Sequence, residues 1–304
     1  MNQINGEHKV LIAGGTGLIG NRLCELLSSK GMKVVLLSRS LKANSKYPTY
    51  KWDPAKDILD PASLEGVTHI VSLAGTSISD HYWTTAYKND VVKSRLDAAA
   101  TLLNALTNHP NSVQKIIAAS AVGFYGNRGD EVCNEESSSG TGFLSITSTQ
   151  WEKAYAKATI PVTTLRVGVV LSKDGGALPQ LAGTTPYGIT TILGTGKQWI
   201  SWIDLDDVCG LFAEAITNEK FTGTINAVAP NPMTQEAFMQ VVKKQFHSKG
   251  ILLPVPAFLL RIILGEKAAI VLDSTRVSAA KALKFGYTFR YETAEQSLAH
   301  IYGN

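Results

Sequence analysis

The sequence predicts an α/β protein, namely a doubly wound parallel sheet of the Rossmann type with a small C-terminal substrate lobe. Three observations lead to this fold class. Short apolar runs typical of buried parallel strands recur along the first 170 residues. Stretches with helical spacing separate these runs. The first run also ends directly in a glycine-rich turn that opens a helix, as in dinucleotide-binding folds.

The expected elements follow one another in an alternating order. Strands are predicted at residues 10–13, 34–37, 69–73, 115–119 and 162–166, and helices at 18–29, about 84–107 and about 150–158. After Leu171 the pattern loosens, with a late strand at 224–228 and a helical, apolar stretch from about 249. We expect an NAD(P)-binding domain of residues 1–248 and a small domain of residues 249–304. The C-terminal third of the chain would fold over the carboxyl edge of the sheet, where doubly wound proteins bind ligands.

Composition excludes several classes of function. The chain has 304 residues, of which 44% are hydrophobic, enough for a full core. Its 29 basic and 25 acidic residues are scattered without a basic stripe, which argues against nucleic-acid binding. The three cysteines, Cys24, Cys133 and Cys209, lack the number and spacing of a disulfide framework or a zinc site. The N-terminus lacks the apolar core of a signal peptide and no stretch is long enough to span a bilayer, so we expect a cytoplasmic protein without membrane contact.

A dinucleotide site is predicted at the first strand–helix junction. Gly14, Gly17 and Gly20 form a G-x-x-G-x-x-G pattern there. Gly14 permits the tight turn, Gly17 lets the backbone approach a pyrophosphate, and Gly20 lets the helix pack closely on the strand. The helix N-terminus supplies N–H donors to the phosphates. The alternative is an ordinary glycine-rich turn. The expected phosphate-binding residues are Gly14, Thr16, Gly17, Leu18, Ile19 and Gly20.

The end of the second strand indicates which cofactor binds. An Asp or Glu usually contacts the ribose 2′-hydroxyl of NAD, but this sequence has Ser38, Arg39 and Ser40. Arg39 lies about 20 residues after the glycine loop, where the ribose-reading residue is expected. A guanidinium can hold a 2′-phosphate with two hydrogen bonds. We therefore predict NADP(H), with Ser38 and Arg39 in its site; the alternative is a solvated surface arginine.

Further motifs are similar to those of a known family. They lie at residues 14–20, 52–54 (Trp-Asp-Pro), 73–75 (Leu-Ala-Gly), 94–95 (Ser-Arg), 120–126 (Ser-Ala-Val-Gly-Phe-Tyr-Gly), 165–171, 196–198, 201–204, 206–207 and 254–256. Together they resemble the extended short-chain dehydrogenases, the group of nucleotide-sugar epimerases and dehydratases. The closest resemblance is to the atypical "epimerase family", or sugar nucleotide epimerase-like, subfamily, which ends in a small domain of unknown function.

The resemblance implies more cofactor contacts. It places Leu73, Ala74 and Gly75 beside the cofactor ribose, where small residues let the chain pass close to the ligand; simple packing at a strand end is compatible with this. Asp53 resembles the family's carboxylate at the adenine edge, and a turn aspartate beside Pro54 is the alternative. On the same basis Arg95 and Val167 are assigned to the cofactor site, and a surface role is the alternative for Arg95.

The resemblance also raises a question about catalysis. Family enzymes use a Ser or Thr, a Tyr and a Lys, and Ser120 matches the hydroxyl position. A strand-end serine that caps a turn is the alternative for Ser120. The Tyr-x-x-x-Lys pair is missing, because Phe143 or Leu144 replaces the tyrosine and Thr147 or Ser148 the lysine. The candidate substitutes are Tyr125, which packing beside Phe124 would also explain, and Lys88, which a solvated helix surface would explain.

A substrate site is predicted in the segment 193–202. Lys197 offers charge, Gln198 hydrogen bonds and Trp202 an indole for stacking on a small, sugar-nucleotide-like ligand. A hairpin with core tryptophans is the alternative. Asp206 and Asp207 lack neighbouring histidines, and the resemblance implies a structural role at a helix start. We therefore expect no metal.

These observations leave two classes of function. The first is an NADP(H)-dependent oxidoreductase or epimerase-like enzyme, favoured by Ser120 and the 193–202 segment, since a pure sensor needs no second site. The second is a catalytically silent NADP(H)-binding sensor or regulator, favoured by the missing Tyr-x-x-x-Lys pair. A structural module without ligand is disfavoured by the intact glycine loop.

Overall fold

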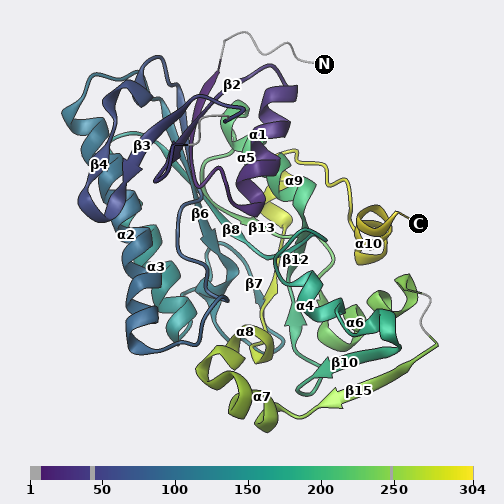
Figure 1. The fold of residues 1–304 in the computed structure, drawn as a ribbon. Helices are drawn as coiled ribbons and strands as arrows, with labels where there is room; N and C mark the ends of the chain where they lie inside the picture. The colour runs from purple at the N-terminus through teal and green to yellow at the C-terminus, as the bar shows by residue number, and fades with distance from the viewer. Residues whose placement is uncertain (1–7, 42–44, 247–248, 304) are drawn as a thin grey trace.

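The computed structural model describes residues 8–41, 45–246 and 249–303. Its centre is an eight-stranded sheet (Figure 1). In spatial order the strands are β13 (Gly223–Ala227), β8 (Val162–Val167), β6 (Lys115–Ala121), β5 (His69–Ser72), β1 (Lys9–Ala13), β2 (Lys33–Ser38), β3 (Thr49–Asp53) and β4 (Ile58–Leu59). All neighbours pair in parallel except β3 and β4. The strand order reverses at β1, so the predicted doubly wound topology is confirmed.

Helices cover both faces of the sheet. α1 (Leu18–Ser29) packs with α5 (Leu205–Thr217), and α2 (Thr85–Asn108) packs with α3 (Phe143–Tyr155) on the other side (Figure 1). The apolar spacing explains these positions, because Leu23 and Leu27 of α1 are fully buried. Side-chain caps fix two of the starts. Thr84 accepts a hydrogen bond from the Tyr87 amide before α2, and Asp204 accepts one from the Asp206 amide before α5.

Helix α3 begins earlier than the sequence pattern predicted. It starts at Phe143, after Gly142 with φ of 87°, rather than at about residue 150. Its buried face carries Ser145, Thr147 and Ser148, which are polar and hide the apolar period. Two of these hydroxyls find partners nearby: Ser145 Oγ donates to the carbonyl of Phe124 and Thr147 Oγ1 to that of Phe143, both at 2.8 Å.

The remaining elements build the carboxyl edge and the C-terminal part. They are β7 (Val132–Cys133), β9 (Val169–Leu171), α4 (Leu178–Ala182), β10 (Ile189–Leu193), β11 (Trp199–Ile200), β12 (Trp202–Asp204), β14 (Met233–Thr234), α6 (Gln235–Gln245), β15 (Ile251–Val255), α7 (Ala257–Leu264), α8 (Ala269–Leu272), β16 (Arg276–Val277), α9 (Ala280–Lys284) and α10 (Ala294–Tyr302). Residues 251–255 were expected to be helical, but they form a strand parallel to β10. Pro254 and Pro256 explain this, because proline is excluded from helix interiors.

A second hydrophobic core lies beside the one around the main sheet. It joins Leu171, Trp202 and Phe238 to Leu298 of α10. This core therefore draws on residues from both sides of position 248, and the division at 248 stays a prediction. No helix in the described part of the chain is both long and apolar enough to cross a membrane.

Candidate functional site

Two glycines of the 14–20 loop are required by the fold itself. Gly14 has φ of 88°, and a Cβ there would lie 2.8 Å from the carbonyl carbon of Leu73 and 2.9 Å from the amide nitrogen of Ala74. A Cβ at Gly20 would lie 2.2 Å from the carbonyl oxygen of Gly14. The glycine loop thus lies directly against the chain that leaves β5, the arrangement expected for residues 73–75.

Gly17 is different, because the packing of the protein does not require a glycine there. Its φ is −80°, and a Cβ would meet, among the described atoms, only the carbonyl oxygen of Gly14 at an ordinary 3.5 Å. Helix α1 starts here without a side-chain cap and without an acidic residue in its first turn. The amides of Leu18 and Ile19 therefore open the helix beside exposed Thr16. An uncapped N-terminus with an open approach is suited to an anion.

A second positively charged place lies at the ends of β2 and β3. The exposed Arg39 side chain makes no hydrogen bond or ion pair within the described ranges. Ser38 Oγ donates to the carbonyl of Ser40 at 2.8 Å, which folds the turn around Arg39. Lys51, opposite Ser38 in the strand register, donates from Nζ to the carbonyl of Arg39 at 2.5 Å. The sequence analysis missed Lys51, since only the pairing of β2 with β3 brings it there.

Asp53 lies at the end of β3, on the expected adenine side of the site. Its carboxylate is 3.7 Å from Nζ of Lys56, so that lysine partly compensates its charge. Asp53 precedes a short 3-10 turn at Pro54–Lys56 but makes no side-chain cap there. The structure thus gives no support to the capping alternative, and the adenine-edge role stays a prediction.

Arg95 lies against the loop that follows β5. A Cβ on Gly75 would be 3.1 Å from its side chain. Arg95 Nη1 donates to the carbonyls of Thr76 at 3.0 Å and Val91 at 2.8 Å, and its guanidinium lies 4.8 Å from the ring centre of Trp151. Burial lowers the pKa of Arg95 to about 10. No carboxylate in the described chain pairs with it, so its charge is available to an anionic ligand.

Ser120 is part of a hydrogen-bonded network at the end of β6. It donates from Oγ to Oε1 of Glu152 at 2.6 Å. Arg166, opposite Ser120 on β8, binds both oxygens of that carboxylate, Nε to Oε1 and Nη2 to Oε2, each at 2.8 Å. No motif of the sequence indicated a role for Glu152. Glu152 joins the network because α3 passes close to the end of β6. The spacing of residues along the sequence does not reveal this contact between helix and strand.

Tyr125 is not accessible to a ligand, and this corrects its candidate role as a proton carrier. Its side chain is fully buried and packs edge-on against Phe124. Its hydroxyl donates to Oδ1 of Asn226 at 2.6 Å and accepts from Nη1 of Arg166 at 3.0 Å. Burial raises the pKa of Tyr125 to about 12. The packing alternative therefore describes this tyrosine better.

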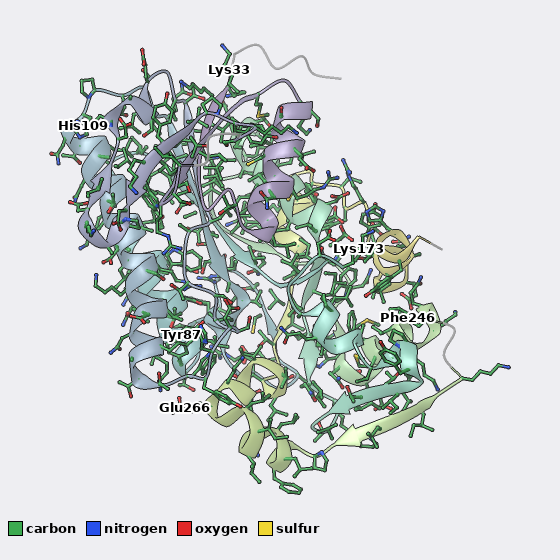
Figure 2. The ribbon with its side chains drawn as sticks, in the orientation of Figure 1. Lys33, Tyr87, His109, Lys173, Phe246 and Glu266 are labelled. Carbon is green, nitrogen blue, oxygen red and sulfur yellow. The ribbon has the colours of Figure 1, made fainter. Side chains whose placement is uncertain are left out.

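The start of α3 carries no ionisable side chain where the tyrosine and lysine were expected. Phe143 packs edge-on against Trp83 with ring centres 4.8 Å apart. The ammonium of Lys88 lies 5.9 Å from the Phe143 ring centre and forms a 2.8 Å ion pair with Glu266. Tyr87 and Glu266, labelled in Figure 2, mark the place where α2 meets the C-terminal segment. Lys88 is therefore paired rather than freely solvated.

The segment 193–202 holds the C-terminal part together, which corrects most of its expected role in substrate binding. Trp202 is fully buried in the second core, and its indole donates to the carbonyl of Asn231 at 3.0 Å. The amide of Gln198 is buried and donates to the carbonyls of Leu193 and Val271 at 2.8 and 3.0 Å. Of the three residues predicted to contact the substrate, only Lys197 is exposed. The alternative of core tryptophans holds for Trp202.

The acidic residues before α5 have protein partners. Ligand atoms of Asp204, Asp206 and His300 lie within 4.8 Å of one another. Asp206, however, accepts a 2.6 Å hydrogen bond from Nε of Arg22, and Asp204 accepts one from Ser297 at 2.6 Å. Buried Asp207 accepts bonds from the hydroxyl of Tyr287 and from the amides of Arg290 and Tyr291. The pair thus has the structural role that the resemblance implied.

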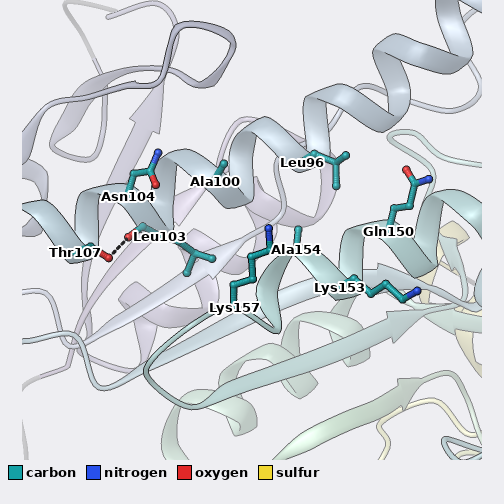
Figure 3. A pocket seen from close by; sticks show the side chains of 9 residues that line it. All are labelled: Leu96, Ala100, Leu103, Asn104, Thr107, Gln150, Lys153, Ala154 and Lys157. Atoms are coloured by element: carbon teal, nitrogen blue, oxygen red, sulfur yellow. Dashed lines mark hydrogen bonds between the residues drawn. The ribbon is translucent and has the colours of Figure 1, made fainter.

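A groove between α2 and α3 lies apart from these residues. Its walls carry apolar and polar side chains from both helices (Figure 3). They are Leu96, Ala100, Leu103, Asn104, Thr107, Gln150, Lys153, Ala154 and Lys157. None of the predicted site residues lines this groove.

Val167, also assigned to the cofactor site, is buried at the carboxyl end of β8 and pairs with Ala121 of β6.

The strand order, the open glycine and the uncapped helix together define a Rossmann-type α/β protein. The chain belongs to the NAD dependent epimerase/dehydratase family, which matches residues 10–227. Residues 255–301 match a domain of unknown function, DUF1731. Both matches confirm the resemblance drawn from the sequence motifs, including the family-specific C-terminal segment.

Three similar proteins set the context. An epimerase family protein SDR39U1 homolog, chloroplastic, from Arabidopsis thaliana is 33% identical and aligns over 99% of this chain and 88% of its own. The crystal structure of the human epimerase family protein SDR39U1 with NADPH is 26% identical, with a TM-score of 0.88 and coverage of 97% of this chain and 99% of that one. A nucleoside-diphosphate sugar epimerase from Corynebacterium glutamicum is 31% identical, with a TM-score of 0.78, and this chain spans 59% of its length.

Proposed function

We propose that this protein binds NADP(H) along the carboxyl edge of the sheet and is an oxidoreductase or epimerase-like enzyme acting on a small hydroxylated substrate. The observation that carries the proposal is Gly17. Among the described residues, no packing contact requires a glycine at this position. Gly17 lies at an uncapped helix start, beside the point where the strand order reverses. The close approach of a pyrophosphate would require a glycine here. The human relative was crystallised with NADPH, which supports the choice of ligand.

The two ends of the cofactor are assigned from the strand order. β2 and β3 lie on one side of β1, and β5, β6 and β8 on the other. The adenosine half is proposed to lie over β2 and β3, where Arg39 and Lys51 face the 2′-phosphate and Asp53 the adenine edge. That phosphate carries about −1.5 to −2 charges at neutral pH, by analogy with phosphorylated side chains. Arg39 and Lys51, which have no carboxylate partner among the described residues, supply two positive charges to match it.

The other half is proposed to lie over β5 and β6. Leu73, Ala74 and Gly75 border the ribose, Arg95 faces the anionic part of the ligand, and Val167 closes the far wall. When bound, the nicotinamide supplies hydride transfer. Ser120 then orients the substrate oxygen, and Lys197 remains the one candidate of the 193–202 segment that is exposed to an anionic substrate.

Calorimetry with NADPH and NADH tests the proposal. We expect NADPH to bind more tightly than NADH to the unmutated protein, and equal affinities would reject the 2′-phosphate site. The second candidate function is a silent NADP(H) sensor, favoured by the lack of an ionisable group at residues 143–148. A sensor would bind NADPH but leave every substrate in a product analysis unchanged. The cytoplasmic location stays a prediction, and one relative is named chloroplastic.

A further inference from the structure

We propose that Glu152 takes over the role of the missing tyrosine as proton acceptor. The proton of the substrate hydroxyl would reach Glu152 through Ser120. The inference rests on the proposed function and adds a positioning residue to it. It starts from the direction of one hydrogen bond. Because an ionised carboxylate only accepts, the 2.6 Å contact requires Ser120 to donate its proton to Glu152.

That direction decides what Ser120 offers to a ligand. With its only proton committed to Glu152, the Ser120 oxygen presents lone pairs and accepts a hydrogen bond. The group bound there is therefore a donor, as an alcohol is and a carbonyl is not. Short hydrogen bonds to an ionised acceptor are also the stronger ones, which holds the Ser120 hydroxyl in this orientation.

The carboxylate is itself held in place from behind. Arg166 binds both of its oxygens, and the guanidinium lies 3.4 Å from the ring centre of Phe124. Arg166 also donates to Tyr125, whose proton is directed to Asn226. Glu152 thus accepts hydrogen bonds from Arg166 on both of its oxygens, and on Oε1 it also accepts the proton of Ser120.

The pair lies on the half of the sheet proposed for the nicotinamide. Ser120 is the next-to-last residue of β6, and β6 pairs with β5 beyond the reversal at β1. The start of α3, where family enzymes carry the tyrosine, has only Phe143 and Leu144 to offer. Glu152 lies further along the same helix, and its carboxylate contacts the Ser120 hydroxyl.

The proton transfer is balanced. The substrate O–H bond breaks, and its proton passes to the Ser120 oxygen while the Ser120 proton passes to Glu152. The C–H bond of the same carbon breaks, and its hydride leaves to an oxidised nicotinamide, NADP⁺. The products are a carbonyl compound, the reduced nicotinamide and a protonated Glu152. In the reverse direction, the proton and the hydride return to the carbonyl compound. In an epimerisation, the hydride can return to either face of the carbonyl carbon.

The test is a spectroscopic one that needs no identified substrate. The full chain is labelled with carboxyl-¹³C glutamate, and the Glu152 resonance is assigned by its loss in Glu152→Gln. Spectra are compared for the NADP⁺ and NADPH complexes at one pH. We expect the Glu152 resonance to shift between the two complexes, because the ring charge changes beside Ser120. The resonance of exposed Glu131, which pairs with Arg128, serves as the control and should not shift.

Ser120→Ala provides the second arm and keeps the Glu152–Arg166 pair intact. We expect this variant to bind both cofactors within twofold of the unmutated protein and to lose at least half of the Glu152 shift. Cofactor binding with an unmoved Glu152 resonance would overturn the relay and leave the proposed function standing. A chain that binds neither cofactor in calorimetry would overturn the proposed function and, with it, this inference.

Discussion

Gly14 and Gly20 are in such close contact that a methyl group on Gly20 would lie 2.2 Å from the Gly14 carbonyl oxygen. A methyl group on Gly17, between them in the sequence, would meet among the described atoms only the Gly14 carbonyl oxygen, at an ordinary 3.5 Å. The three glycines of one motif therefore serve two purposes. Two of them let a strand, a turn and a helix pack together, and the third lies where we propose that the pyrophosphate binds.

This distinction predicts opposite effects for two substitutions. Gly17→Val should keep the fold and abolish binding of NADPH, because the new side chain would occupy the proposed pyrophosphate position. Gly20→Ala should destabilise the protein by about 1–3 kcal/mol or more, since its methyl group overlaps backbone. Denaturant unfolding and calorimetry on both variants check this. A folded Gly17→Val protein with unmutated affinity would show that the phosphates bind elsewhere.

The preference for NADPH should depend on Arg39 and Lys51. Arg39→Ala should remove most of the preference, at a cost of about 1.5–3 kcal/mol for a charged hydrogen bond. Lys51→Gln should weaken the binding of NADPH by a smaller amount, about 1 kcal/mol, and leave the affinity for NADH unchanged. The matched control is Lys30→Gln, which removes the same charge at the far end of α1. Equal losses for Lys51→Gln and Lys30→Gln would indicate a general effect of net charge.

The sequence could predict the sheet and the glycine loop because each depends on local pattern. Buried parallel strands are continuous apolar runs in the sequence. A glycine motif between a strand and a helix is typical of the tight turn in a Rossmann-type fold. The start of α3 escaped prediction because Ser145, Thr147 and Ser148 are buried on the side that faces the sheet. The hydroxyls of Ser145 and Thr147 bond to backbone carbonyls, so this buried helix face has the composition of an exposed one.

The site was predictable only where one segment builds it. Arg39 follows from its distance to the glycine loop, but Lys51 depends on a strand register and Glu152 on the contact of α3 with β6. The residue types of the 193–202 segment suit a ligand, yet Gln198 and Trp202 use their polar atoms on the protein itself. Composition does not distinguish a polar group that binds a ligand from one that binds a neighbouring carbonyl.

Tyr125 should matter for stability rather than for ligand binding. Tyr125→Phe leaves Oδ1 of buried Asn226 without its donor, a loss of about 1–3 kcal/mol in the free energy of unfolding. The affinity for NADPH should stay unchanged, because the hydroxyl is buried and bonds to Asn226 and Arg166 of the protein itself. Tyr82→Phe, at an exposed tyrosine, is the control and should change neither quantity. The reverse outcome, with stability kept and binding lost, would restore Tyr125 to the ligand site.

His69 should make the fold sensitive to acid. Burial, followed by the nearby charges of His8 and Lys115, lowers the pKa of His69 to about 4. The unfolded chain then binds this proton more readily than the folded one, so the stabilisation is complete above about pH 6.5 and is lost as the pH falls towards 4. The full difference is about 3 kcal/mol. We expect His69→Phe to flatten the curve of unfolding free energy against pH over this window, and exposed His81→Phe to leave its slope unchanged.

Epimerisation of common nucleotide sugars by the usual family route should be very slow. That route transiently oxidises a sugar carbon and uses a tyrosinate as base, whereas Phe143, Leu144, Thr147 and Ser148 have no group that ionises near neutral pH. Tyr125 is buried and its proton is directed to Asn226, so it offers no substitute. Any proton transfer must therefore pass through Ser120 or the substrate itself. Incubation of the purified protein with UDP-glucose and UDP-galactose, in the presence of NADP⁺, followed by product analysis, checks this. We expect NADPH to bind and little of either sugar to convert. Rapid interconversion that survives Glu152→Gln would mean that a base outside the Ser120 network serves the reaction.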